Sequence, residues 1–129
     1  METGRLAPFS LFAGLDEEAL STVAARASEV AVDQGHKLAV EGDFGHALYV
    51  IESGTAEVTS DGEILRVLGP GDVFGELAVL VSGRRTASVV ATTPLRLIAL
   101  FKRDVWALEK EAPAVAERLR ALIAERTSA

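Results

Sequence analysis

Hydrophobic residues recur at two different spacings along this chain, and the change of spacing divides it into three parts. From Asp16 to Ala27 the apolar side chains recur every three or four residues, which predicts an amphipathic helix capped at its N-terminus by Asp16. From Ser28 to Leu100 the spacing is that of short β-strands. After Leu100 the helical spacing returns, so the pattern predicts a helix, a β-region and further helices.

Turn sequences divide the β-region into short strands. Asp61-Gly62, Ser53-Gly54 and Thr93-Pro94 are examples of turns that favour a positive or a fixed φ. The strands expected are residues 29–33, 37–41, 47–53, 55–60, 63–68, 86–92 and 95–100. Many short strands with regular turns are typical of an antiparallel jelly roll, or β-roll. The fold class expected is therefore mainly β, with α-helices flanking the roll at both ends.

One segment interrupts the rhythm of strands. Residues 74–83 take the place of a further hairpin, but their composition predicts a short helix that starts near one glycine and ends at another. We expect this helix to be inserted in the roll. The boundaries expected for a single domain over residues 1–129 are an N-terminal helix at about 16–27, the roll at about 28–100 and C-terminal helices at about 103–126.

The C-terminal part is expected to hold two helices. Asp104 is expected to cap the first, and Pro113 suits the first position of the second. The rings of Trp106 and Tyr49 are expected in the core. The last helix carries an apolar stripe of Val115, Leu119, Leu122 and Ile123. The sequence leaves open whether this stripe packs on the roll, covers a ligand or meets a partner helix, including that of a homodimer.

Composition and charge exclude several classes of protein. The chain has 129 residues, is 49% hydrophobic and 25% charged, and contains no cysteine, so it should fold without disulfides or thiolate metal sites. Its apolar runs are far shorter than the roughly 20 residues that cross a bilayer, and no secretion signal is evident. We expect a cytoplasmic location and no membrane partner. A net charge of −6 makes nucleic acid a poor direct partner.

Residues 74–87 combine features of an anion site. A glycine at a helix start allows close approach to the backbone, and the free N–H groups of a first turn bind anions. The fork of an arginine such as Arg85 matches two phosphate oxygens. Glu76 would repel a phosphate, but its carboxylate can accept hydrogen bonds from sugar hydroxyls. The combination suits a phosphorylated ribose.

These residues also resemble a known family. The run from Gly71 to Ala78, continued by Arg85 to Val89, resembles the phosphate-binding cassette of cyclic nucleotide-binding domains of the catabolite activator and protein kinase regulatory subunit type. Glu41-Gly42-Asp43 and Leu48 to Ile51 resemble the first hairpins of that family, and Phe12 to Leu15 resembles the segment that leads into its roll. The resemblance covers roughly residues 9–126. It is specific because the entry segment, the hairpins, the cassette and the closing helices occur in the same order as in the family.

The resemblance implies roles for individual residues. Arg85 neutralises the cyclic phosphate, Glu76 takes the ribose 2′-hydroxyl and Gly75 lets the sugar approach. Thr86 lies near the phosphate or a guanine amino group. The ligand-binding residues expected are Gly75, Glu76, Leu77, Ala78, Arg85, Thr86 and Ala87, with Leu65 and Leu68 as apolar contacts to the base. Arg84 is expected to face solvent, and the helix from Pro113 is expected to be a lid.

The function expected is a sensor for a cyclic nucleotide, cAMP first and cGMP second, that signals through its C-terminal helices. The nucleotide is a ligand, and no cofactor or metal is expected. The effector, either a separate protein or a linked domain, is not specified by the sequence. One alternative is a domain of the same fold that binds no ligand and serves as an interaction scaffold, with Glu76 and Arg85 as a structural ion pair.

A metal enzyme of the cupin type is the alternative from another class. His36 and His46 lie in or near turns, but they lack the close spacing and the carboxylates of a jelly-roll metal site. No Gly-x-Ser-x-Gly motif is present, and neither histidine has an evident nucleophile as partner. The sequence therefore predicts no enzyme and no catalytic residue.

Overall fold

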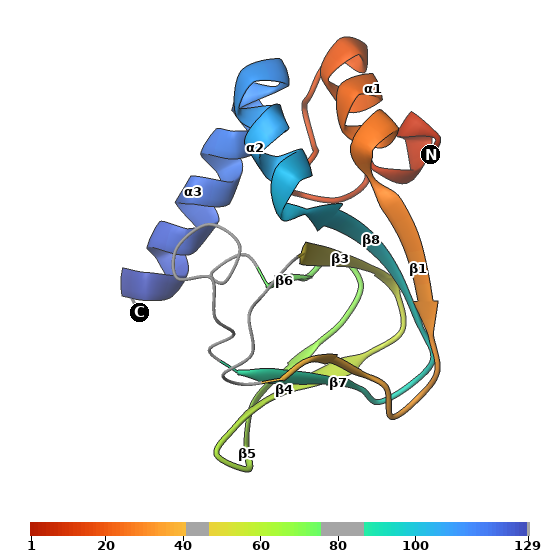
Figure 1. Cartoon of the computed structure of the whole chain (residues 1–129), viewed down its shortest axis with the longest axis vertical. Coiled ribbons are helices and arrows are strands. Elements are labelled where there is room, and N and C mark those ends of the chain that lie inside the picture. Colours follow the sequence, from red (N-terminus) through yellow and green to blue (C-terminus); the bar gives the residue numbers. More distant parts are fainter. Residues whose placement is uncertain (41–46, 76–86, 129) are drawn as a thin grey trace.

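Two antiparallel sheets, each of four strands in the described part of the chain, form the centre of the molecule (Figure 1). The structure, a computed structural model, describes residues 1–40, 47–75 and 87–128, with the backbone alone for 122–128. The strands are β1 Ser28–Val32, β2 Lys37–Ala39, β3 Ala47–Ser53, β4 Ala56–Ser60, β5 Glu63–Leu68, β6 Val73–Phe74, β7 Ser88–Ala91 and β8 Leu95–Phe101. One sheet has the order β1-β8-β3-β6, and the other has the order β2-β7-β4-β5. The predicted fold class, a β-roll with flanking helices, is confirmed.

The helices lie together against the first sheet, on the face that points away from the second sheet (Figure 1). They are the 3-10 helix η1 Thr3–Arg5, then α1 Glu17–Arg26, α2 Lys102–Glu111 and α3 Pro113–Ser128. The carboxylate of Asp16 accepts a hydrogen bond from the N–H of Ala19 at 2.8 Å, so the predicted cap of α1 is confirmed. Pro113 begins α3 as expected. None of the described helices is long and apolar enough to span a lipid bilayer.

The buried side chains form two apolar clusters, one on each side of the first sheet. The helical cluster joins the helices and the N-terminal segment to this sheet; it consists of Leu6, Leu11, Phe12, Leu20, Val23, Ala24, Leu48, Val50, Val73, Ile98, Leu100, Val105, Leu108, Ala112, Val115 and Leu119. The roll cluster lies between the two sheets; it consists of Ala39, Ile51, Ala56, Val58, Leu68, Phe74, Val89, Ala91, Leu95 and Leu97. Strand β8 contributes to both, because alternate residues of a strand face opposite sides of the sheet.

Three expectations about individual elements were wrong. Phe74 does not start the expected helix, because Val73 and Phe74 form the short strand β6, which pairs with β3; residues 76–83 of that expected helix lie outside the described residues. Asp104 is not the cap of α2, which begins at Lys102; its carboxylate lies inside the first turn and accepts the N–H of Phe101 at 3.1 Å. Trp106 is 58% exposed, because α2 turns its other side toward the helical cluster.

Candidate functional site

A tight turn fixes the chain just before the predicted cassette. The side chain of Asp72 accepts the N–H of Gly69 at 2.8 Å, and its own N–H donates to the carbonyl of Gly69 at 3.0 Å. Gly71, with φ of 91°, donates to the carbonyl of Ile51 at 2.8 Å, and Ile51 donates back to the carbonyl of Asp72 at 3.0 Å. These bonds tie the turn to β3, so the start of the cassette has a defined position.

Strand β6 continues from this turn along β3. Tyr49 lies opposite Phe74 in the register, and their rings stack with centroids 5.1 Å apart. Phe74 is 3% exposed and belongs to the roll cluster. The next residue, Gly75, has φ of 88°, a conformation that residues with a side chain rarely adopt. The backbone therefore changes direction at the glycine that the resemblance assigned to ligand approach.

The described part of the chain resumes at Ala87, directly before β7 of the other sheet. Ala87 is half-buried and packs against the roll cluster. Val89 of β7 lies opposite Val58 of β4 and Ala39 of β2, and all three belong to that cluster. The strands on either side of 76–86, β6 and β7, thus belong to different sheets, and both contact the same apolar interior.

The two leucines expected to contact a base occupy different environments. Leu68, at the end of β5, is 2% exposed and belongs to the roll cluster beside Phe74. Leu65 is 57% exposed and coincides with an irregularity in the pairing of β4 with β5, between Thr59↔Ile64 and Val58↔Arg66. The structure thus brings Leu68 together with the flanks of the cassette in one cluster, and it leaves Leu65 at the surface.

The remaining expected contacts lie outside the described residues. These are Glu76, Leu77, Ala78, Arg85 and Thr86, together with Arg84, His46 and the first hairpin at Glu41-Gly42-Asp43. The side chains of Leu122 and Ile123 also lie outside the description. Their assigned roles remain predictions. In the part of the chain that the structure describes, no three His, Asp or Glu side chains are grouped as metal ligands would be.

One feature of the site was missed from the sequence, the stack of Tyr49 on Phe74. The turn before the cassette is signalled by Gly69-Pro70-Gly71-Asp72, since Asp side chains bond to nearby backbone N–H groups, and the structure confirms it. The stack of Tyr49 on Phe74 had no comparable signal, because it depends on the pairing of β6 with β3.

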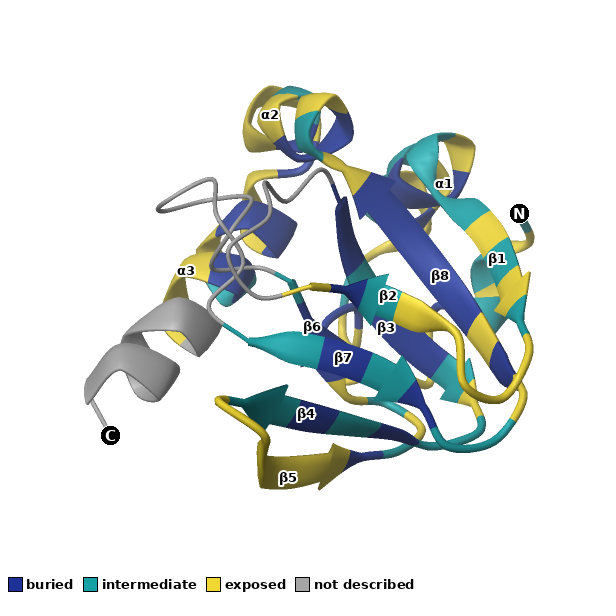
Figure 2. Ribbon diagram, turned by 60° about the horizontal axis from the view of Figure 1, so that its bottom comes forward, coloured by how far each residue is buried: buried dark blue, intermediate teal, exposed yellow. Residues whose placement is uncertain are grey.

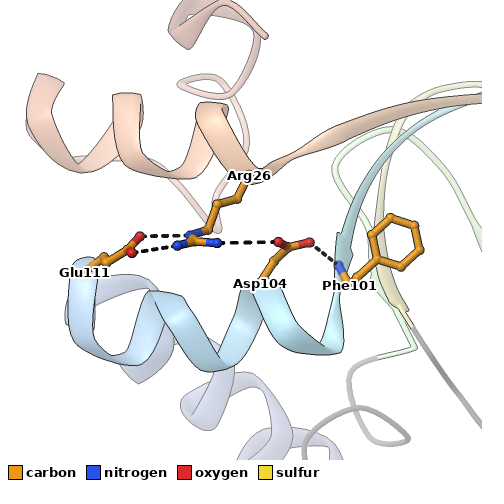
Figure 3. A network of polar contacts seen from close by, with 4 residues as sticks. All are labelled: Arg26, Phe101, Asp104 and Glu111. Atoms are coloured by element: carbon orange, nitrogen blue, oxygen red, sulfur yellow. Dashed lines mark hydrogen bonds and ion pairs between the residues drawn. The ribbon is translucent and has the colours of Figure 1, made fainter.

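An ion-pair network joins α1 to α2 (Figure 3). The guanidinium of Arg26 donates to both carboxylate oxygens of Glu111 and lies 3.8 Å from a carboxylate oxygen of Asp104. The hydrogen bond with Arg26 lowers the pKa of Glu111 and raises the pKa of Arg26. Glu111 is the last residue of α2, so the network holds the end of this helix directly before the connection to α3.

The first half of α3 is held against the N-terminal segment. Val115 and Leu119 are no more than 1% exposed and belong to the helical cluster. The guanidinium of Arg118 donates to the carbonyls of Ser10 and Leu11 at 3.3 and 3.1 Å. The described members of the apolar stripe, Val115 and Leu119, therefore pack on the other helices and the first sheet. This is one of the options that the sequence left open.

Comparison with known proteins places this arrangement in a family. The family profile described as "Cyclic nucleotide-binding domain" matches residues 29–111, from β1 to the end of α2. The chain belongs to the cyclic nucleotide-binding domain family. The matched range includes both flanks of 76–86, the turn at Asp72 and the whole roll. The cyclic nucleotide-binding domain is a regulatory module, and the predicted resemblance is confirmed.

Similar proteins include bacterial and fungal regulators. The domain is 37% identical to the "Cyclic AMP receptor protein" of Thermus thermophilus, over 90% of this chain and 56% of that protein. It is 43% identical to a "cAMP-dependent protein kinase regulatory subunit" of Yarrowia lipolytica, over 70% of this chain and 24% of that protein. The crystal structure of the Thermus thermophilus catabolite activator protein superimposes with a TM-score of 0.82 at 37% identity, over 92% of this chain and 58% of that one. The chain thus spans about half the length, or less, of these relatives.

Proposed function

We propose that this cyclic nucleotide-binding domain is a sensor for cAMP, with cGMP as a weaker second ligand, and that it catalyses no reaction. The main observation behind the proposal is where the residues just before and just after 76–86 lie. Phe74 and Ala87 contact one apolar interior from two sheets, and Gly75 turns the backbone between them. The names of the Thermus and Yarrowia relatives both refer to cAMP, which is why cAMP is placed before cGMP.

The ligand contacts proposed are those of the cassette. Arg85 neutralises the single negative charge of the cyclic phosphate through its two-pronged donor fork, and Glu76 accepts hydrogen bonds from the ribose 2′-hydroxyl. Leu77, Ala78, Thr86 and Ala87 line the same pocket. Leu68 lies nearer the interior than Leu65, so we expect it to be the more important apolar neighbour of the base.

We propose that nucleotide binding is signalled by a change in α3. A ligand shifts an equilibrium only when it contacts the two states differently, so one element must change its contacts with the nucleotide. Ala112, with φ of −145° and ψ of 69°, interrupts the helical conformation between α2 and α3. Val115 and Leu119 anchor the first half of α3, so we expect the part after Leu119 to respond to the nucleotide.

Calorimetric titration tests the proposed ligand. The wild-type protein should bind cAMP more tightly than cGMP, and both more tightly than 5′-AMP, whose phosphate carries extra charge. Arg85→Ala should cost about 2–5 kcal/mol of cAMP binding, the range for removing one partner of a desolvated charge pair. Arg84→Ala is the matched control and should retain most of the affinity.

Three results would contradict this function. Equal affinity for cAMP and 5′-AMP would remove the cyclic phosphate as the recognised group. Equal losses in the Arg84 and Arg85 variants would show that the wrong arginine has been chosen. Absence of binding to either cyclic nucleotide would instead favour the interaction scaffold of the same fold.

A further inference from the structure

The turn before the proposed cassette is closed twice by the same two residues. The N–H of Asp72 donates to the carbonyl of Gly69 at 3.0 Å, and the N–H of Gly69 donates to Oδ2 of Asp72 at 2.8 Å. Pro70 and Gly71 lie between them, and Gly71 has φ of 91°. Proline in the second position and a positive φ in the third are typical of a type II turn. The carboxylate thus adds a second closure to a turn that the backbone already forms.

The same turn is joined directly to strand β3. Gly71 donates to the carbonyl of Ile51, and the N–H of Ile51 donates to the carbonyl of Asp72. Strand β6 follows at once and lies beside β3 (Figure 2). Because β6 has only two residues, the bonds at the turn are a large part of what fixes its position on β3.

The side chain of Asp72 is exposed and belongs to neither apolar cluster. Within the described residues its carboxylate forms no ion pair, and its bond to the N–H of Gly69 is its structural contact. Replacing this side chain therefore opens no cavity and leaves no buried charge without a partner. Variants at this position should fold, so an effect on binding can be measured separately from stability.

We propose that Asp72 is a positioning residue for the nucleotide: its bond to Gly69 holds the turn, and thereby Gly75, in the arrangement that binding requires. This role rests on the proposed function, since it concerns the affinity for the nucleotide. Gly75 comes three residues after Asp72, and its φ of 88° sets the direction of the backbone there. When the binding-competent arrangement is only partly populated, the apparent dissociation constant rises by the inverse of that fraction. Loss of the carboxylate bond lowers this fraction, so it weakens binding without removing a ligand contact.

The test is calorimetric titration of the full chain, at a temperature where circular dichroism shows each variant to be fully folded. Asp72→Ala should weaken cAMP binding roughly three- to tenfold, the factor that corresponds to the net free energy of one such hydrogen bond. Asp72→Asn keeps an oxygen that can accept the N–H of Gly69 and removes the negative charge, so its affinity should stay within about twofold of wild type. Because the turn acts on the backbone and not on the base, Asp72→Ala should weaken cGMP binding by the same factor.

Another turn of the roll supplies the matched control. Between β7 and β8, Oγ1 of Thr93 accepts the N–H of Thr55 at 2.9 Å, a bond of the same kind as that of Asp72. Thr93→Val should lower the melting temperature at least as much as Asp72→Ala does, but it should leave cAMP affinity unchanged.

A pair of glycine variants tests the same turn without altering the carboxylate. Gly71 and Gly62 both have positive φ, 91° and 81°, and nothing lies within 4 Å of a Cβ atom added to either. Each alanine therefore incurs a similar conformational cost. Gly71→Ala should weaken cAMP binding, whereas Gly62→Ala, in the turn between β4 and β5, should not.

The role of Asp72 and the proposed function can fail separately. A wild-type protein that binds neither cyclic nucleotide contradicts both. A wild-type protein that binds cAMP, with equal affinity in Asp72→Ala, contradicts the role of Asp72 alone. An equal loss in Thr93→Val also contradicts it, because any loosened turn would then have the same effect. Asp72→Asn binding as weakly as Asp72→Ala would point to the charge of the carboxylate instead of its hydrogen bond, and would overturn the positioning role.

Discussion

Arg26 and Glu111 are the last residues of two helices, and their side chains meet in a two-pronged ion pair with N–O distances of 2.8 and 2.6 Å (Figure 3). Helix α1 precedes the roll and α2 follows it, so this contact joins segments 85 residues apart in the sequence. It lies one residue before Ala112, where the helical conformation is interrupted. The pair therefore fixes the point from which α3 departs.

Stability should depend on this pair in acid. The hydrogen bond with Arg26 lowers the pKa of Glu111 below its ordinary value of 4.5, so the folded protein binds this proton less readily than the unfolded chain. The stabilisation is therefore complete above pH 4.5 and is lost as pH falls through the lowered pKa. Glu111→Gln should have a lower melting temperature than wild type at pH 7. This difference should shrink below pH 4, as measured by thermal melts across the pH range.

The matched comparison for acid stability is Glu52→Gln. A hydrogen bond with Arg5 lowers the pKa of Glu52 in the same way, so this variant should show the same trend. Ala substitution of Glu57, a partly exposed carboxylate on β4 with no ion pair among the described residues, is the control. A melting difference for Glu111→Gln that stays constant from pH 7 to pH 3 would contradict the role of the ion pair.

Gly54 should tolerate alanine less well than Gly62. Both have positive φ, 94° and 81°, so each alanine incurs a conformational cost of about 1–2 kcal/mol. A Cβ atom on Gly54 would also clash with the carbonyl oxygen of Pro94, whereas nothing lies within 4 Å of the same atom on Gly62. Urea unfolding should therefore show a clearly larger loss for Gly54→Ala. Equal losses would mean that the neighbouring turn moves away without cost.

Phe74 should matter for both stability and binding. Its buried ring stacks on Tyr49 and sits directly before Gly75, so it fixes one flank of the cassette. Phe74→Ala should cost about 3–5 kcal/mol of unfolding free energy. Phe74→Leu should retain most of the stability but weaken cAMP binding. Calorimetry of the Leu variant at a temperature where it is fully folded separates the two effects, and unchanged affinity would contradict the role in binding.

Trp106 should be dispensable for folding. It is 58% exposed, and Lys102 lies 5.7 Å from the centre of its ring, so Trp106→Ala should change the unfolding free energy by about 0.5 kcal/mol or less. Leu108, fully buried in the helical cluster of the same helix, is the comparison, and its replacement by alanine should cost about 2–5 kcal/mol. Similar losses in the two variants would indicate that α2 presents a different side to the core.

Hydrogen exchange should divide α3 into two parts. Amides of residues 115–121 should be protected with and without nucleotide, because Val115 and Leu119 are buried and Arg118 bonds to the N-terminal segment. Saturating cAMP should increase protection mainly in residues 122–128. If neither part responds to cAMP, α3 is not the element that carries the signal.

The longer strands could be predicted well from the sequence. A strand as short as β6, and the side of a helix that faces the core, could not. Strands β3 and β5 match the expected ranges 47–53 and 63–68, because turns bound them and a strand pattern fills them. Strand β6 has two residues, too few for a period to be seen, and it exists through its pairing with β3. The exposure of Trp106 depends on which side of α2 meets the core, and spacing alone does not settle that.

The same limit applies to the site. Gly75, Leu68 and Ala87 were predicted as neighbours of one ligand, and the structure places all three at or beside the roll cluster. Leu65 was predicted with them because the family resemblance places an apolar contact to the base there. A shift of register at that residue leaves it at the surface, and such shifts arise from pairing with another strand, which local sequence does not specify.

The helical cluster and the roll cluster lie on opposite faces of strand β8, so along this strand only the backbone lies between them. Leu95 and Leu97 project into the roll, and Ile98 and Leu100 project toward the helices, so the strand contacts both clusters, and Figure 2 shows most of it as buried. Close-packed interiors transmit displacement rather than absorb it. A side chain displaced within the roll therefore shifts the strand on which α2 packs, and α3 packs on α2. Strands β3 and β6 also have side chains in both clusters, so the mechanical path from the roll to the helices runs through the first sheet as a whole.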